Sequence, residues 1–238
     1  MKIAHLFGNN ILERREEAEF STVLYQNNKI VVKKLVDEKA ARDELEIVSF
    51  LNNHNFNTYQ IMNSEFEDAE GYIIYKYING VDGFHAHRDN NYFYSVGKQI
   101  GMLHILMQDY AKSKNKKVSY IHGDLHSGNV IVDNGKIYII DFSSVVEDWQ
   151  CNDLLNIEYE ALYEKDSKEK RKAFVTGYGE QLKISYPDKE YVLQKIMEND
   201  LNEYNRWEKR DWKDSEYHTH LKVCVEAHQP TFIPTWLI

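Results

Sequence analysis

The chain of 238 residues has few cysteines and prolines and no long hydrophobic run. Its two cysteines, Cys151 and Cys224, have no neighbours at the spacing of metal ligands, so neither a disulfide framework nor a zinc site is expected. Three prolines leave little room for a linker between domains. No run approaches the roughly 18 apolar residues of a membrane-spanning helix, and the apolar stretch at the N-terminus is too short for a secretory signal. We therefore expect a cytoplasmic protein with no membrane partner.

The sequence also lacks three common catalytic motifs, the G-x-x-x-x-G-K-[ST] phosphate loop, the G-x-S-x-G elbow and the H-E-x-x-H helix. Their absence removes the commonest P-loop, hydrolase and zinc-protease interpretations. The net charge of -9, from 29 basic and 38 acidic residues, argues against nucleic acid as a partner. An acidic cleft would attract a cationic substrate, although solvated helix faces explain the same excess of charge.

The stretch YIHGDLHSGNVIVDNGKIYIIDFSS, residues 120–144, combines two β-prone runs with acidic and amide side chains. The runs 130–132 and 137–140 are rich in β-branched and aromatic residues. Between them lie Asn134 and Gly135, and an Asn-Gly pair is the strongest short-range signal of a hairpin turn. The sequence therefore predicts a β-hairpin here.

The predicted register brings three oxygen-bearing side chains to one end of this hairpin. With Asn134 and Gly135 as the loop, Asn129 faces Ile140, so its amide and the Asp141 carboxylate can converge. Magnesium prefers such oxygen ligands and shares them with substrate phosphates. Asp124, in the preceding loop, would be free to accept a proton as a general base. An Asx-capped loop that leads into an ordinary hairpin is the alternative.

The upstream stretch KIVVKKLVDEKAARDELEIVSFL predicts a strand over residues 29–35 and then a helix that ends near Leu51. Asp37 is the expected N-cap of this helix. Four residues at helical spacing form one face, and one of them is acidic: Ala41, Glu44, Val48 and Leu51.

An ionised Glu44 within an apolar face is costly unless it meets a cation. Lys33 on the preceding strand is the natural partner, and Lys34 is the other candidate. Alternatively, Glu44 reaches the edge of the helix and both lysines face solvent.

The sequence resembles the aminoglycoside phosphotransferase and choline kinase family, which has the protein-kinase-like fold. The family signature is a His-Gly-Asp-Leu-His-x-Gly-Asn loop followed by Ile-Asp-Phe, and it occurs here as HGDLHSGN (122–129) and IDF (140–142). A protein kinase would have His-Arg-Asp and Asp-Phe-Gly, whereas this chain has Gly123 and Ser143 at the differing positions. The departure favours a small-molecule kinase.

The resemblance implies an α+β fold with two lobes, a small strand-rich N-terminal lobe (1–78) and a larger, mainly helical C-terminal lobe (79–238). It also implies a kinase that transfers the γ-phosphate of ATP to a hydroxyl of a small molecule. The expected acceptor is an aminoglycoside, an amino sugar or a choline-like amine, all of which can carry a positive charge. GTP is a possible alternative to ATP, and Mg²⁺ is the expected metal ion.

The resemblance also implies roles for individual residues. Asp124 would orient and deprotonate the acceptor, while His122 would brace its loop by hydrogen bonding. The other residues would hold the phosphates and the metal ion: Lys33 fixed by Glu44 at the phosphates, and Asn129 with Asp141 as ligands of magnesium.

Two further segments resemble parts of the family. GYIIYKYING, residues 71–80, resembles the hinge between the lobes, where the Lys76 carbonyl and the Ile78 amide would bind the adenine and Tyr75 would line the back of the pocket. In the family, helices near the C-terminus wall the acceptor pocket. The candidates in this region are Glu203, Trp207 and Asp211.

The expected phosphate loop departs from the family pattern, because residues 11–28 contain no glycine. Glu16, Glu17 and Glu19 lie near its expected turn, and clustered carboxylates repel phosphate unless they point outward. A catalytically silent pseudokinase that binds nucleotide and acts as an interaction module therefore stays an alternative, as does a protein kinase.

Overall fold

The structure is a computed structural model of the chain. It divides into two compact units, the first formed by residues 1–86 and 128–145 and the second by residues 87–127 and 146–238. Each unit is described by itself. The described residues are 11–14, 20–25, 28–34, 38–62, 72–208 and 216–237.

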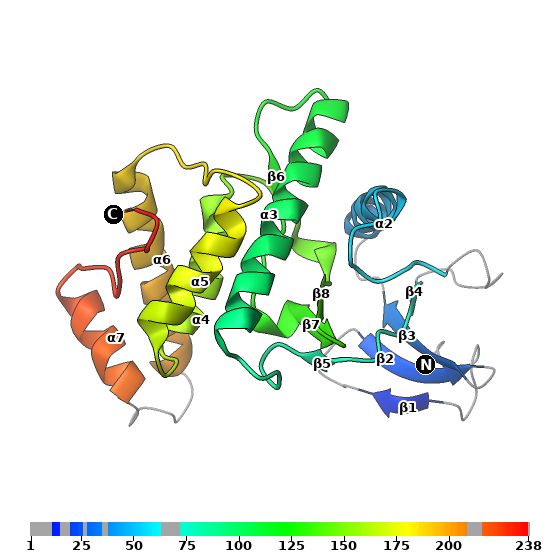
Figure 1. The fold of residues 1–238 in the computed structure, drawn as a ribbon, viewed down its shortest axis with the longest axis horizontal. Coiled ribbons are helices and arrows are strands. Elements are labelled where there is room, and N and C mark those ends of the chain that lie inside the picture. Colours follow the sequence, from blue (N-terminus) through cyan, green and yellow to red (C-terminus); the bar gives the residue numbers. More distant parts are fainter. Residues whose placement is uncertain are drawn as a thin grey trace. The chain divides into compact units, whose positions relative to one another are not determined.

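An antiparallel sheet with the strand order β1-β2-β3-β4 forms one part of the first unit (Figure 1). In β3 the side chains of Ile30, Val32 and Lys33 are buried. The predicted strand over residues 29–35 is therefore confirmed for residues 29–34, and its last residue lies outside the described residues. The strands are β1 (Ile11–Arg14), β2 (Phe20–Tyr25), β3 (Asn28–Lys34) and β4 (Tyr72–Lys76).

Helix α2 (Glu38–Asn53) connects β3 to the segment that precedes β4. The face predicted from helical spacing is buried, and Glu44 is buried within it at 2% exposure. The expected N-cap Asp37 lies outside the described residues, as do Glu16, Glu17 and Glu19 of the expected phosphate loop.

The predicted hairpin also belongs to the first unit. β7 (Val130–Asp133) and β8 (Lys136–Ile139) pair in the predicted register, with Val130 opposite Ile139. Asn134 and Gly135 have φ values of 49° and 78°, as a type I′ turn requires. The Ile140 amide donates to the Asn129 carbonyl at 3.0 Å, so these two residues face each other as expected.

The division into lobes of residues 1–78 and 79–238 stays a prediction. In the first unit the hairpin pairs with a third strand, β5 (Val81–Asp82), in a sheet of the order β5-β7-β8. A strand of two residues has no periodicity that a sequence could reveal.

The second unit is mainly helical. Within the described residues, no helix is long and apolar enough to cross a membrane. The elements are α3 (Asn90–Ser113), α4 (Cys151–Leu162), α5 (Ser167–Gly179), α6 (Lys189–Glu208), α7 (Glu216–Glu226), β6 (Tyr120–Ile121) and β9 (Val146–Glu147).

Helices α3 and α5 lie side by side and touch through their backbones (Figure 1). A Cβ atom at Gly97 would lie 2.0 Å from the Phe174 carbonyl oxygen, and one at Gly177 would lie 2.0 Å from the Tyr94 carbonyl oxygen. Both distances are far shorter than van der Waals contact. The two glycines are therefore what allows the helices to pack at this distance.

We expect Gly177→Ala to destabilise the protein by about 1 to 3 kcal/mol or more, because the methyl group forces α3 and α5 apart. Gly179, in the same helix, is the matched control, since a Cβ there meets nothing within 4 Å. Gly179→Ala should be neutral or stabilising by about 0.5 kcal/mol. Urea denaturation of both variants measures the difference, and equal stability of the two would contradict this role of Gly177.

Candidate active site

A buried lysine between two carboxylates forms the centre of the site in the first unit. Lys33 Nζ lies 2.7 Å from Glu44 Oε2 and 2.9 Å from Asp141 Oδ1. Lys34 is exposed, so the structure selects Lys33 from the two candidates. Burial acts to lower the pKa of Lys33, but the two carboxylates outweigh it and the pKa is raised. Lys33 therefore carries its positive charge at neutral pH.

Two tyrosines complete the surroundings of Glu44. The hydroxyls of Tyr59 and Tyr75 each donate to Glu44 Oε1 at 2.8 Å. Burial, together with the charge of Glu44, raises the pKa of both hydroxyls, so they stay protonated as donors. With Lys33 on Oε2, both oxygens of the buried carboxylate have partners, which is the condition for burying such a group.

Asp141 follows the hairpin in a left-handed conformation, with φ 64° and ψ 72°. Its Oδ1 also accepts a hydrogen bond from the Ser143 hydroxyl at 2.8 Å. Asn129, at the start of the same hairpin, is buried at 8% exposure. An amide and a carboxylate oxygen have the chemistry that magnesium prefers, and magnesium often takes only one or two protein ligands.

No group of three or more His, Cys, Asp or Glu side chains that could hold a metal ion occurs among the described residues. The pair of Asn129 and Asp141 is not such a group, because it has two members and one of them is an amide. Such a pair would share a metal ion with substrate phosphates.

The predicted hinge lies at the end of β4. Lys76 is the last residue of the strand, and its amide donates to the Gln60 carbonyl at 2.9 Å. Ile78 lies in the connector that follows, where its carbonyl accepts from the Gly80 amide at 3.0 Å. Binding of adenine by the Lys76 carbonyl and the Ile78 amide stays a prediction.

In the second unit, Asp124 lies in a loop that its neighbours brace. The Asp124 amide donates to Nδ1 of the fully buried His122 at 3.4 Å. The Asp124 side chain is 57% exposed, and its Oδ2 lies 3.8 Å from His126 Nε2. The carboxylate is thus held on a constrained backbone and faces solvent, as a group that meets a substrate must.

Two acids of α4, the buried Asp153 and the half-buried Glu160, hold this loop. Asp153 accepts the His122 amide at 2.8 Å and the Gly123 amide at 2.9 Å, and it also contacts His104 Nε2 at 3.0 Å. Burial acts to raise the pKa of Asp153, but the hydrogen bond and charge of His104, followed by His122 and the Gly123 amide, hold it below the ordinary value. Asp153 is therefore ionised at neutral pH.

The second acid, Glu160, holds the other end of the loop. It accepts the Ser127 amide at 3.0 Å and the Ser127 hydroxyl. Arg88 lies 3.3 Å from Glu160 and supplies its positive charge. Because Asp153 and Glu160 are two helical turns apart, they share one face of α4.

Neither of these acids was predicted from the sequence. The signal that identified Glu44 was present for Asp153 too, since it lies on one helical face with the buried residues Ile157 and Ala161. An acid on a buried face of a helix could thus have been found, although its partners, two backbone amides of a loop, could not.

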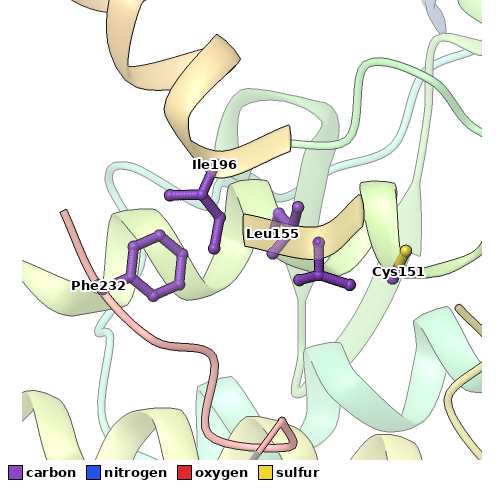
Figure 2. Close-up of a cluster of buried hydrophobic side chains, with 5 residues drawn as sticks. Cys151, Leu155, Ile196 and Phe232 are labelled. Atoms are coloured by element: carbon purple, nitrogen blue, oxygen red, sulfur yellow. The ribbon is translucent and has the colours of Figure 1, made fainter. Parts of the chain in front are cut away.

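A cavity of about 240 Å³ in the second unit contains both Asp124 and the predicted acceptor residue Glu203. Its apolar side is part of a buried cluster in which Leu155 of α4, Ile196 of α6 and Phe232 come together (Figure 2). Its polar side is rich in amides. The other lining residues are Asn156, Tyr159, Asn199, Asn202 and Arg206.

Of the other two acceptor candidates, Trp207 lies in α6, but its side chain is outside the described part of the structure. Asp211 lies outside the described residues altogether. Their roles stay predictions.

A sequence profile described as the phosphotransferase enzyme family matches residues 108–190, which include the Asp124 loop, the hairpin and α4. Among curated proteins, none matches the chain in sequence.

Solved structures of phosphotransferases share the fold along nearly the whole chain. The amicoumacin kinase hAmiN, in complex with AMP-PNP, Ca²⁺ and Ami, has a TM-score of 0.74 at 14% identity, with 99% of this chain and 94% of that chain covered. The AMP-bound spectinomycin phosphotransferase APH(9)-Ia has a TM-score of 0.61 at 16% identity, with 94% and 92% covered. Choline kinase LicA from Streptococcus pneumoniae has a TM-score of 0.58 at 13% identity, with 95% of each chain covered.

These structures confirm the predicted α+β, protein-kinase-like fold. The profile match over residues 108–190 supports the family resemblance and the predicted enzyme class, a phosphotransferase.

We expect Asp153→Asn to destabilise the protein by about 2 to 3 kcal/mol at pH 7, because the new amide group turns an N–H donor toward a backbone donor. The folded pKa of Asp153 is lowered, so its contribution is present above the unfolded pKa of about 3.9 and is lost as the pH falls through the folded value. The difference in free energy of unfolding between wild type and variant should therefore become smaller only below about pH 4.

Urea denaturation between pH 3 and pH 7 measures this difference in free energy of unfolding. Asp109→Asn is the control, because Asp109 is an exposed acid of α3 whose partner is Lys112. If Asp153→Asn loses no more stability than Asp109→Asn, Asp153 does not support the loop as described.

Proposed function

We propose that the protein transfers the γ-phosphate of ATP to a hydroxyl group of a small molecule and uses Mg²⁺. The observation that carries this proposal is Lys33, which is buried and charged between Glu44 and Asp141. A lysine fixed by one carboxylate, next to a second carboxylate suited to a metal ion, is the apparatus that phosphoryl transfer requires. Solved structures with this fold that contain AMP-PNP or AMP support the same cosubstrate.

The residues of the site would have distinct tasks. Lys33 would neutralise the negative charge of the phosphates, and Asn129 with Asp141 would provide oxygen ligands for magnesium. Magnesium, when bound, would compensate the charge that spreads over the transferred phosphoryl group.

The reaction itself would need a proton acceptor. The acceptor hydroxyl oxygen would form a bond to the γ-phosphorus, the bond from that phosphorus to the β–γ bridging oxygen would break, and ADP would leave. Asp124 would take the proton of the hydroxyl. Its exposed carboxylate on a braced loop supports this assignment.

The lining of the second-unit cavity favours an amino sugar among the expected acceptors. Its amide side chains of Asn156, Asn199 and Asn202 are suited to hydroxyl groups. Its charged residues are Asp124, Glu203 and Arg206, and Arg206 lies 3.6 Å from Glu203. Two acids and one base leave a single negative charge, which matches one ammonium group. The volume of about 240 Å³ suits one ring rather than a drug-sized molecule.

Asp124→Asn should lower kcat by about 10² to 10⁴, because the amide cannot accept the proton. Binding of the magnesium–nucleotide complex should change little. Asp141→Asn should instead abolish magnesium-dependent nucleotide binding. Steady-state kinetics and calorimetric binding separate the two effects, and equal, mild effects of both substitutions would contradict the assigned roles.

Glucosamine should be phosphorylated with a higher kcat/KM than glucose or choline, because Glu203 can pair with its ammonium group. We expect Glu203→Gln to reduce the preference for glucosamine over glucose by about fivefold to twentyfold, the effect of one partly solvated ion pair. Glu198→Gln is the control, since Glu198 lies on the same helix and pairs with a basic residue, Lys195, but is not part of the lining of this cavity. A preference for choline, or equal effects of the two substitutions, would rule out this acceptor class.

A further inference from the structure

Tyr59 lies where three elements of the first unit meet. It is part of the connector between α2 and β4, and this connector is held on two sides by backbone hydrogen bonds. On one side the Lys76 amide of β4 donates to the Gln60 carbonyl at 2.9 Å, and on the other the Ile139 amide of β8 donates to the Asn57 carbonyl at 3.1 Å. The position of Tyr59 is therefore fixed by its neighbours along the chain.

The hydroxyl of Tyr59 joins two residues of the site by two hydrogen bonds. It donates to Glu44 Oε1 at 2.8 Å, and it accepts the backbone N–H of Asp141 at 2.9 Å. A protonated phenol has one hydrogen to donate and lone pairs that accept, so both bonds can exist together.

The bond to Asp141 supports an uncommon backbone conformation. Asp141 has a φ of 64°, a region that residues other than glycine rarely adopt. The Tyr59 ring packs on the Tyr75 ring with centroids 3.8 Å apart and meets the Phe142 ring edge-on at 6.5 Å. The hydroxyl is thus held rigidly at the turn from which the Asp141 side chain reaches Lys33.

We propose that Tyr59 is a positioning residue for the metal ion. Its hydroxyl links the Asp141 backbone to Glu44 on α2 and so sets the orientation of the carboxylate that would bind magnesium. Lys33 links the same two residues through their side chains, so Glu44 and Asp141 are joined twice. This inference rests on the proposed function, because it assigns a role toward the magnesium of that site.

The chain offers a matched pair of variants. Tyr59→Phe and Tyr75→Phe each remove one hydroxyl that donates to Glu44 Oε1 at 2.8 Å, and only the hydroxyl of Tyr59 also bonds to the Asp141 amide. Any difference between the variants therefore reports the link to Asp141.

The experiment is calorimetric titration of the full-length protein with AMP-PNP at a series of magnesium concentrations. Tyr59→Phe should raise the magnesium concentration for half-maximal binding about tenfold, as substitutions behind a metal ligand do. Tyr75→Phe, which loses the same kind of bond to Glu44 but none to Asp141, should raise it clearly less.

Equal magnesium dependence of the two variants would overturn the inference and leave the proposed function intact. Wild-type protein that binds AMP-PNP without regard to magnesium, or does not bind it, would overturn the proposed function and this inference together. If Tyr59→Phe does not fold, amide hydrogen exchange of wild-type Asp141 decides, because its bond to a buried hydroxyl predicts slow exchange. Exchange at the rate of an unprotected amide would overturn the inference.

Discussion

The ion pair of Lys33 with Glu44 and Asp141 is the interaction on which the first unit depends. Burying a charged group is costly unless its partners are close and satisfied. The three groups of this ion pair come from β3, from α2 and from the turn that follows β8. The pair forms only when α2 turns its buried face toward the sheet and the hairpin has the correct register. A misplaced strand or helix would leave a buried charge alone, so the ion pair makes the arrangement specific.

The second unit uses the same principle around Asp124. Asp153 and Glu160 are held on one face of α4 and accept backbone N–H groups from the two ends of the loop. A carboxylate that accepts backbone amides fixes the loop without using the side chain that would react. The exposed Asp124 can therefore be held in place while its carboxylate remains accessible to a substrate.

The parts that could be predicted from the sequence are those with a local physical signal. The Asn134-Gly135 turn fixes the hairpin register, and the helical spacing around Glu44 shows that an acid is buried and needs a cation. Tyr59 had no such signal, because its role comes from a bond to Asp141, which is 82 residues away. The choice between Lys33 and Lys34 as the partner of Glu44 was open for a related reason, because only the geometry of the sheet decides which of two neighbouring lysines points inward. The resemblance supplied the roles of Lys76 and Ile78, which rest on backbone atoms and have no side-chain signal.

The most direct test of the account is a thermal-shift titration of the wild-type protein with ATP, with and without magnesium. If Lys33, Asn129 and Asp141 form a site for the magnesium–nucleotide complex, ATP should raise the melting temperature only when magnesium is present. The stabilisation should reach about 2.7 kcal/mol when the ligand is at a hundred times its dissociation constant. No shift with ATP and magnesium together would contradict the nucleotide site and would favour a role that does not involve phosphoryl transfer.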